Sequence, residues 1–151
     1  MDRMQLLATL LEREEGRRDE AQAALRQAQQ QADAAKAQGE ALLAYRDEYR
    51  QRWGGQFRQG TSIELLRCYQ GFVQRLDQAI TFQEGQCAHQ NGLLERARQL
   101  LRQRETRVAM VRKLIERRQL AARQVQERRD QKACDEAAQR AGQRLRRLQN
   151  A

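Results

Sequence analysis

The sequence predicts an all-α protein: a long antiparallel two-helix coiled-coil hairpin with a helical overhang at its C-terminal end. Three observations lead to this prediction. The 151 residues include no proline, and 32% of them are charged whereas only 5% are aromatic, a composition typical of long helices. Apolar residues recur at alternating three- and four-residue steps along two stretches of the chain. A glycine-containing segment separates these two stretches, so the chain is expected to fold back there.

The first helix is expected over residues 2–56, because heptad spacing starts at Met4 and most of its positions are apolar. These apolar positions are Met4, Leu7, Leu11, Ala21, Leu25, Ala28, Ala32, Ala35, Leu42, Tyr49 and Trp53. The same spacing predicts a second helix over residues 62–148. Its seam runs from Leu66 through Tyr69, Val73, Leu76, Ile80, Gln83, Cys87, Gln90, Leu94, Ala97, Leu101, Arg104, Val108 and Val111 to Ile115.

The turn is expected at about residues 57–61, where Gly54, Gly55 and Gly60 can end the first helix. Thr61 and Glu64 have the spacing of a capping box for the second helix. We interpret residues 1–151 as one elongated unit. Residues 116–151 then extend beyond the partner helix, and the seam frame breaks within 126–131.

A turn centred near residue 59 makes facing residue numbers sum to about 118. Tyr49 then faces Tyr69, and the two off-pattern charges Glu14 and Arg104 face each other. The middle of the pair is expected to bury little apolar area, because alanines there face Gln83, Cys87 and Gln90.

All the aromatic residues, one Trp, three Tyr and three Phe, lie within residues 45–82. Tyr49, Trp53 and Tyr69 fall on the seam and should form an aromatic clamp near the turn. Tyr45 and Phe72 fall on one flank, in line with two further apolar residues. This strip, defined as Tyr45, Phe72, Leu65 and Ala79, is more than two helices need and predicts a docked partner. The alternative is that these side chains merely cover the seam.

The net charge is +9, and the excess lies in residues 58–151. Basic helices can attract nucleic acid, acidic lipids or an acidic protein surface, but interspersed acidic residues weaken the first two options. The only histidine, His89, lies two residues from Cys87, which places them on different helix faces. We therefore predict no metal site, no cofactor, no small-molecule substrate and no enzymatic activity.

Three widely spaced cysteines are typical of reduced thiols in the cytosol rather than of a disulfide framework. The apolar run at residues 6–11 is too short for a secretory signal. No membrane span is expected either.

An ordered set of blocks resembles the FliJ family, the general chaperone and stalk proteins of the flagellar type III export apparatus. The central block is Gln59-Gly60-Thr61-Ser62, then Tyr69, Phe72-Val73, Leu76, Ala79-Ile80 and Gln83. The flanking blocks are Leu42-Leu43, Tyr45 and Tyr49 before it, and Glu127-Arg128-Arg129-Asp130-Gln131-Lys132 with Asp135-Glu136 after it. The chain departs from the family pattern in its richness in Arg and Gln.

The resemblance implies a hairpin similar to the central stalk of rotary ATPases. It implies a non-enzymatic protein that binds the hexameric flagellar export ATPase and promotes its assembly and coupling. It also implies contact with the cytoplasmic domain of the membrane export gate and the handling of export chaperones. Such a protein is expected in the cytoplasm, peripherally associated with the inner membrane at the flagellar base, and monomeric when alone.

The positions that the resemblance assigns to the export gate are Gln38, Leu42, Tyr45, Tyr49, Phe72, Leu76, Ala79 and Gln83. The candidate ATPase-facing residues are Arg117, Arg118, Arg128, Arg129 and Lys132. Two other functions remain open. One is a generic cytoplasmic coiled-coil scaffold that self-associates through the strip. The other is a basic helical nucleic-acid-binding protein, which the acidic residues among the arginines disfavour.

Overall fold

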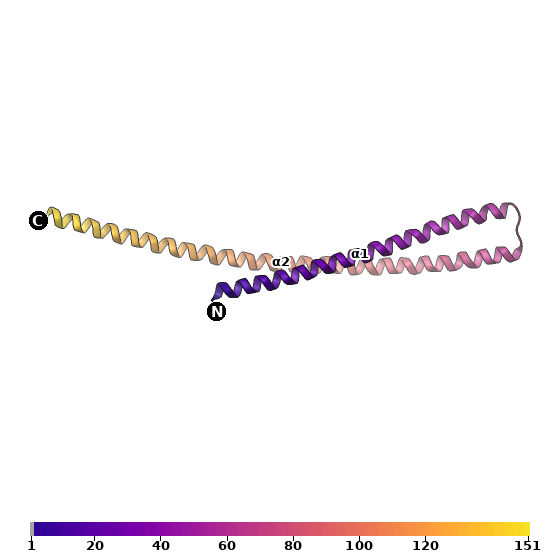
Figure 1. Ribbon diagram of the computed structural model, residues 1–151, viewed down its shortest axis with the longest axis horizontal. Coiled ribbons are helices and arrows are strands. Elements are labelled where there is room, and N and C mark those ends of the chain that lie inside the picture. The colour runs from indigo at the N-terminus through magenta and orange to yellow at the C-terminus, as the bar shows by residue number, and fades with distance from the viewer. Residues whose placement is uncertain (1) are drawn as a thin grey trace. The chain divides into compact units, whose positions relative to one another are not determined.

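The fold is an antiparallel pair of α-helices, seen in a computed structural model that describes residues 2–151 (Figure 1). Helix α1 spans Arg3–Arg58 and helix α2 spans Ile63–Gln149. Within residues 2–151 there is no strand. The predicted all-α hairpin is therefore confirmed. Helix α1 continues two residues beyond the expected end at residue 56.

The chain divides into two compact units, which are described separately. The hairpin unit is Glu15–Glu105 and contains the turn. The terminal unit consists of Met1–Glu14 and Thr106–Ala151. Both units contain parts of α1 and α2, because each helix is continuous across the division.

Contacts between the helices of the hairpin unit show the predicted register. The rings of Tyr49 and Tyr69 stack with their centroids 5.6 Å apart, and the Gln83 side-chain amide donates a hydrogen bond of 2.9 Å to the carbonyl of Ala35. Both pairs match the register that the heptad pattern predicts. The buried apolar residues of this unit are Ala21, Ala32, Ala35, Leu76, Ile80 and Leu94.

Small and polar residues form the middle of this seam. Ala32 and Ala35 are buried, and the carbonyl of Ala35 accepts hydrogen bonds from both Gln83 and the Cys87 thiol, whose sulfur lies 3.2 Å away. Alanines bury little hydrocarbon, so these polar contacts with the backbone replace part of the apolar packing found elsewhere in the seam.

The turn between the helices depends on Gly60, which has a φ of 92°. This left-handed conformation is disfavoured for residues with a Cβ. The backbone amides of Gln59 and Gly60 donate to the carbonyls of Gln56 and Phe57 at 3.1 and 3.3 Å, which closes the last turn of α1.

Ser62 caps the start of α2. Its Oγ accepts a hydrogen bond of 3.2 Å from the backbone amide of Leu65, as expected of an N-cap residue. The predicted capping box of Thr61 and Glu64 is therefore wrong. The helix begins at Ile63, and this start places the serine, rather than the threonine, at the capping position.

Gly54 and Gly55 lie inside α1 rather than at its end. Trp53 and Phe57, on either side of them, both contact Tyr69 of α2, with ring centroids 6.0 and 4.9 Å apart. A helical glycine costs about 1 kcal/mol relative to alanine. Packing of the two flanking rings offsets this cost and carries α1 to Arg58.

Substitution of two glycines should change stability in opposite directions. Gly60→Ala should lower the free energy of unfolding by about 1–2 kcal/mol, because alanine is strained at a positive φ. Gly16→Ala should raise it by about 0.5–1 kcal/mol, because Gly16 lies within a helix and a Cβ there meets no atom within 4 Å. Urea unfolding of both variants measures the two shifts, and shifts of the same sign would contradict this account of the turn.

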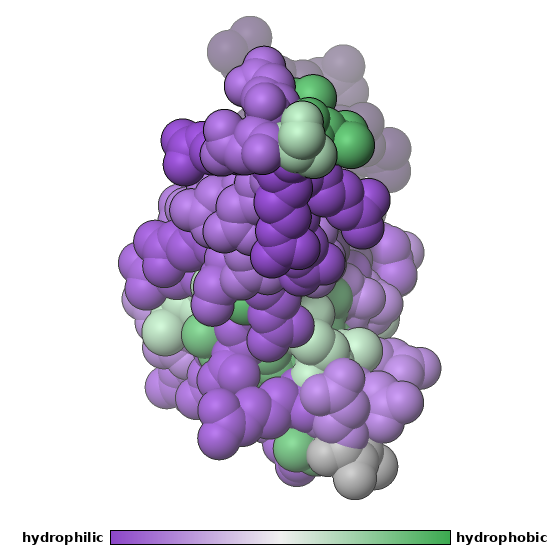
Figure 2. Space-filling model, turned by 90° about the vertical axis from the view of Figure 1, so that its left-hand side faces the viewer, coloured by the Kyte–Doolittle hydropathy of each residue, from purple (hydrophilic) through white to green (hydrophobic). Residues whose placement is uncertain are grey.

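In the terminal unit, Leu7 of α1 and Val108 of α2 are buried, with 9% and 2% of their surfaces exposed. Beyond Ile115 α2 is exposed to solvent, and within residues 116–151 Gly142 alone is half-buried. Figure 2 faces the end that carries the C-terminus and shows mostly hydrophilic side chains. The helix is continuous through residues 126–131, where the seam frame is expected to break, and it ends at Gln149.

Candidate functional site

The aromatic clamp lies near the turn and is centred on Tyr49. Its ring contacts Tyr69 at 5.6 Å and Trp53 at 6.0 Å between centroids, and Trp53 also contacts Tyr69 at 6.0 Å. These contacts confirm the predicted clamp. Phe57 extends it toward the turn, where its ring meets Tyr69 edge-on at 4.9 Å.

The strip begins at the side of this clamp. Tyr45 lies beside Phe72, as predicted, with ring centroids 6.2 Å apart in an edge-on arrangement. Tyr45 is 48% exposed and Leu65 is 47% exposed, and Ala79 is also exposed. The strip is therefore a solvent-exposed apolar surface that a partner can contact.

Phe72 belongs to the clamp as well as to the strip. Its ring centroid lies 4.4 Å from that of Tyr49, and the side chain is half-buried. The expectation that Phe72 contributes only to the exposed flank is therefore too simple. Tyr45 is the ring of the strip that is most available to solvent.

The eight positions assigned to the export gate differ in exposure. Gln38, Tyr45 and Ala79 are exposed, whereas Leu42, Tyr49, Phe72 and Gln83 are half-buried. Leu76 is buried, with 7% of its surface exposed. A docked partner could touch the exposed and half-buried members directly, whereas Leu76 could act only by supporting its neighbours.

An ion pair next to the strip was not predicted from the sequence. Arg46 is half-buried, and its Nη1 lies 3.2 Å from the Oδ1 of Asp77 on the other helix. The signal that could have revealed it is that Arg46 lies between Leu42 and Tyr49 in the seam spacing of the first helix, where a charged side chain requires a partner. The pair links the two helices at the residue that follows Tyr45 in the sequence, and it is worth about 1 kcal/mol or less at this exposure.

The five candidate ATPase-facing residues lie on one face of α2. Residues eleven apart lie only about 20° apart around an α-helix of 3.6 residues per turn. Arg117 and Arg128 therefore share one direction, Arg118 and Arg129 share another, and Lys132 points between them. All five are exposed. We call this set the basic face.

Acidic residues of the same segment interact with side chains one helical turn away. Asp130 accepts a hydrogen bond of 3.0 Å from Gln126, and Asp135 accepts one of 3.2 Å from Gln131. Glu136 lies 3.9 Å from Arg140. Such pairs stabilise a solvent-exposed helix by a few tenths of a kcal/mol each.

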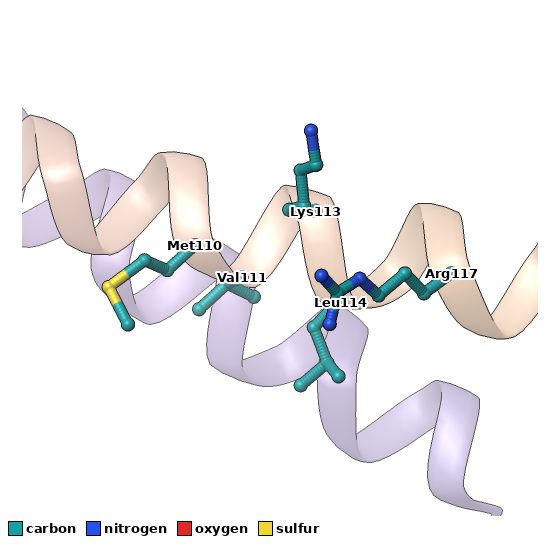
Figure 3. Close-up of a pocket in the computed structure, with 5 residues that line it drawn as sticks. All are labelled: Met110, Val111, Lys113, Leu114 and Arg117. Carbon is teal, nitrogen blue, oxygen red and sulfur yellow. The ribbon is translucent and has the colours of Figure 1, made fainter.

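An open groove adjoins the basic face in the terminal unit (Figure 3). In Figure 3, Met110 and Leu114 project from the same side of α2, Lys113 projects from the other side, and the guanidinium of Arg117 extends toward Leu114. Met110 is 65% exposed. Sequence reasoning missed this groove because two of its three apolar residues, Met110 and Leu114, lie off the heptad seam, whereas Val111 lies on it.

Further features of the described residues bear on chemistry. Among residues 2–151, no group of three His, Cys, Asp or Glu side chains is placed to hold a metal ion. The cysteines Cys68, Cys87 and Cys134 are free thiols. Neither helix, over the part of the chain described, is long and apolar enough to cross a membrane.

Comparison with models of known protein families gives a match. A family model described as "Flagellar FliJ protein" matches residues 4–147, which is nearly the whole chain. No curated protein matches it.

Proposed function

This chain belongs to the FliJ family of flagellar proteins, and from that premise we propose that it is the stalk and escort protein of its flagellar export apparatus. Members of the family are non-catalytic components of that apparatus. In the proposed role the chain binds the hexameric export ATPase, promotes its assembly and coupling, contacts the cytoplasmic domain of the membrane export gate and handles export chaperones. It acts in the cytoplasm, in peripheral association with the inner membrane at the flagellar base.

The exposed ring of Tyr45 is the observation that carries the gate-binding part of this proposal. Its centroid is 6.2 Å from the rings of both Tyr49 and Phe72, so neighbouring rings restrict its position, although 48% of its surface is exposed. A tyrosine held in place loses little further freedom on binding and is a common anchor at protein interfaces. The two-helix pair itself does not require this surface.

The basic face supports the ATPase-binding part. Its five cations lie within about 120° of the helix circumference, and this part of α2 is exposed. Such a face complements an acidic surface on a partner and speeds the encounter with it. The adjoining groove of Met110 and Leu114 adds an apolar contact next to Arg117.

Addition of the chain to the purified export ATPase tests the proposed coupling role. The rate of ATP hydrolysis and the fraction of hexamer should both rise as the chain is titrated in. A stable complex that shows neither rise would contradict the coupling role, because the chain would then bind the ATPase without promoting its assembly.

A further inference from the structure

The turn end of the hairpin unit exposes apolar side chains at the start of α2. Three of the first four residues of α2 are apolar, and Ile63, Leu65 and Leu66 are 70%, 47% and 37% exposed. Leu65 also belongs to the strip, whereas Ile63 lies beyond it, next to the turn. Water therefore contacts apolar side chains on both sides of Glu64 in the first turn of α2.

Arginines surround this first turn in the sequence. Arg50, Arg52 and Arg58 precede it in the last two and a half turns of α1, and Arg67 follows it in α2. All four are exposed. Residues 50–67 contain one acidic residue, Glu64, so this end carries a local excess of positive charge.

The clamp fixes the two helix ends at this point. Phe57, in the last turn of α1, contacts Tyr69 of α2 at 4.9 Å, and Trp53 contacts the same ring at 6.0 Å. Arg58 and Ile63 are therefore held on either side of a short turn with a defined glycine conformation. A surface ordered before binding loses less entropy when it docks.

We propose that this tip, defined as residues 50–67, docks on an anionic phospholipid surface. Exposed isoleucine and leucine next to arginine match the side chains by which helices bind at the membrane interface. The apolar side chains would enter the boundary between headgroups and acyl chains, while the guanidinium groups pair with lipid phosphates. The proposal does not require binding to the gate or to the ATPase, although Leu65 belongs to both the tip and the strip.

Vesicle co-sedimentation of the full chain tests the proposal. At physiological salt the chain should sediment with phosphatidylglycerol-containing vesicles and remain in the supernatant with pure phosphatidylcholine. Ile63→Asp should weaken this binding by at least tenfold, and Arg58→Gln and Arg67→Gln by about fivefold each. Aspartate is favourable in the first turn of a helix, so the helix content measured by circular dichroism should be unchanged in Ile63→Asp.

Phe82→Asp is the matched control, because Phe82 is 68% exposed in the same unit and the variant has the same net charge as Ile63→Asp. It should bind vesicles within about threefold of wild type, since it lies outside the tip. Equal losses in the two variants would overturn the proposal, as would equal sedimentation with both kinds of vesicle. Tyr45→Ala should retain vesicle binding, and a loss there would assign the lipid contact to the strip instead.

Discussion

Tyr45→Ala should weaken binding of the chain to the cytoplasmic domain of the export gate by about thirtyfold. The ring is 48% exposed and is the most accessible aromatic side chain of the strip, and truncation of such an anchor commonly costs 2 kcal/mol or more of binding free energy. Stability should change by less than about 1 kcal/mol, because the ring is half in solvent. Titration calorimetry with the purified gate domain measures the affinity, and urea unfolding measures the stability.

Phe82→Ala is the control for that experiment, since it removes a ring that is 68% exposed and lies outside the strip. It should bind the gate domain as the wild type does. Phe72→Ala is less informative, because a ring that lies 4.4 Å from Tyr49 also supports the clamp, and its loss should cost about 1–3 kcal/mol of stability. Wild-type affinity in Tyr45→Ala would show that the strip is not the gate-binding surface.

Neutralising the whole basic face should abolish stimulation of the export ATPase. Replacement of Arg117, Arg118, Arg128, Arg129 and Lys132 by glutamine removes every member of the face while keeping side chains that favour helix. Affinity for the ATPase should fall by at least a hundredfold at low salt, because the long-range attraction to an acidic surface is lost. The rate of hydrolysis at increasing chain concentration measures the effect.

A second set of five glutamine substitutions controls for net charge. Arg13, Arg26, Lys36, Arg50 and Arg52 are exposed on α1, and their replacement lowers the net charge by the same amount. This variant should stimulate hydrolysis nearly as well as the wild type. If the two variants lose stimulation equally, total charge rather than the position of the basic face determines binding to the ATPase.

The register of the hairpin could be predicted because it follows from periodicity alone. Heptad spacing in both helices, together with a short turn, places Tyr49 opposite Tyr69 and Ala35 opposite Gln83, and the structure shows both contacts. The same reasoning located the clamp and the pairing of Tyr45 with Phe72. These features depend on which side of a helix a residue occupies, and this is determined by residue number.

The exact first and last residues of the turn could not be predicted from the sequence. They depend on three-dimensional packing and on local backbone geometry. Gly54 and Gly55 have low helix propensity, yet contacts of Trp53 and Phe57 with Tyr69 keep them helical. Thr61 and Ser62 both carry a hydroxyl suited to capping, and only the observed helix start at Ile63 selects Ser62. Neither the packing of rings between the helices nor the residue at which the second helix begins can be read from one sequence.

The candidate site could be predicted only in part, because its details also depend on three-dimensional packing. The spacing of the aromatic residues showed where the strip lies, but the half-burial of Phe72 and the ion pair between Arg46 and Asp77 depend on side-chain conformation. The groove depends on Met110 and Leu114, which lie off the seam at positions where the heptad pattern predicts only solvent-exposed side chains. Exposure at these positions is therefore a structural result.

If one chain carries separate surfaces for the gate and for the ATPase, it should hold the two together, and a bridging assay measures this. The cytoplasmic domain of the gate is immobilised, the export ATPase is passed over it, and the retained ATPase is measured with and without the chain. We expect the wild-type chain to increase retention, and neither Tyr45→Ala nor the variant with a neutralised basic face to do so. If the wild-type chain binds each partner alone but leaves retention unchanged, the two surfaces do not act together on one chain.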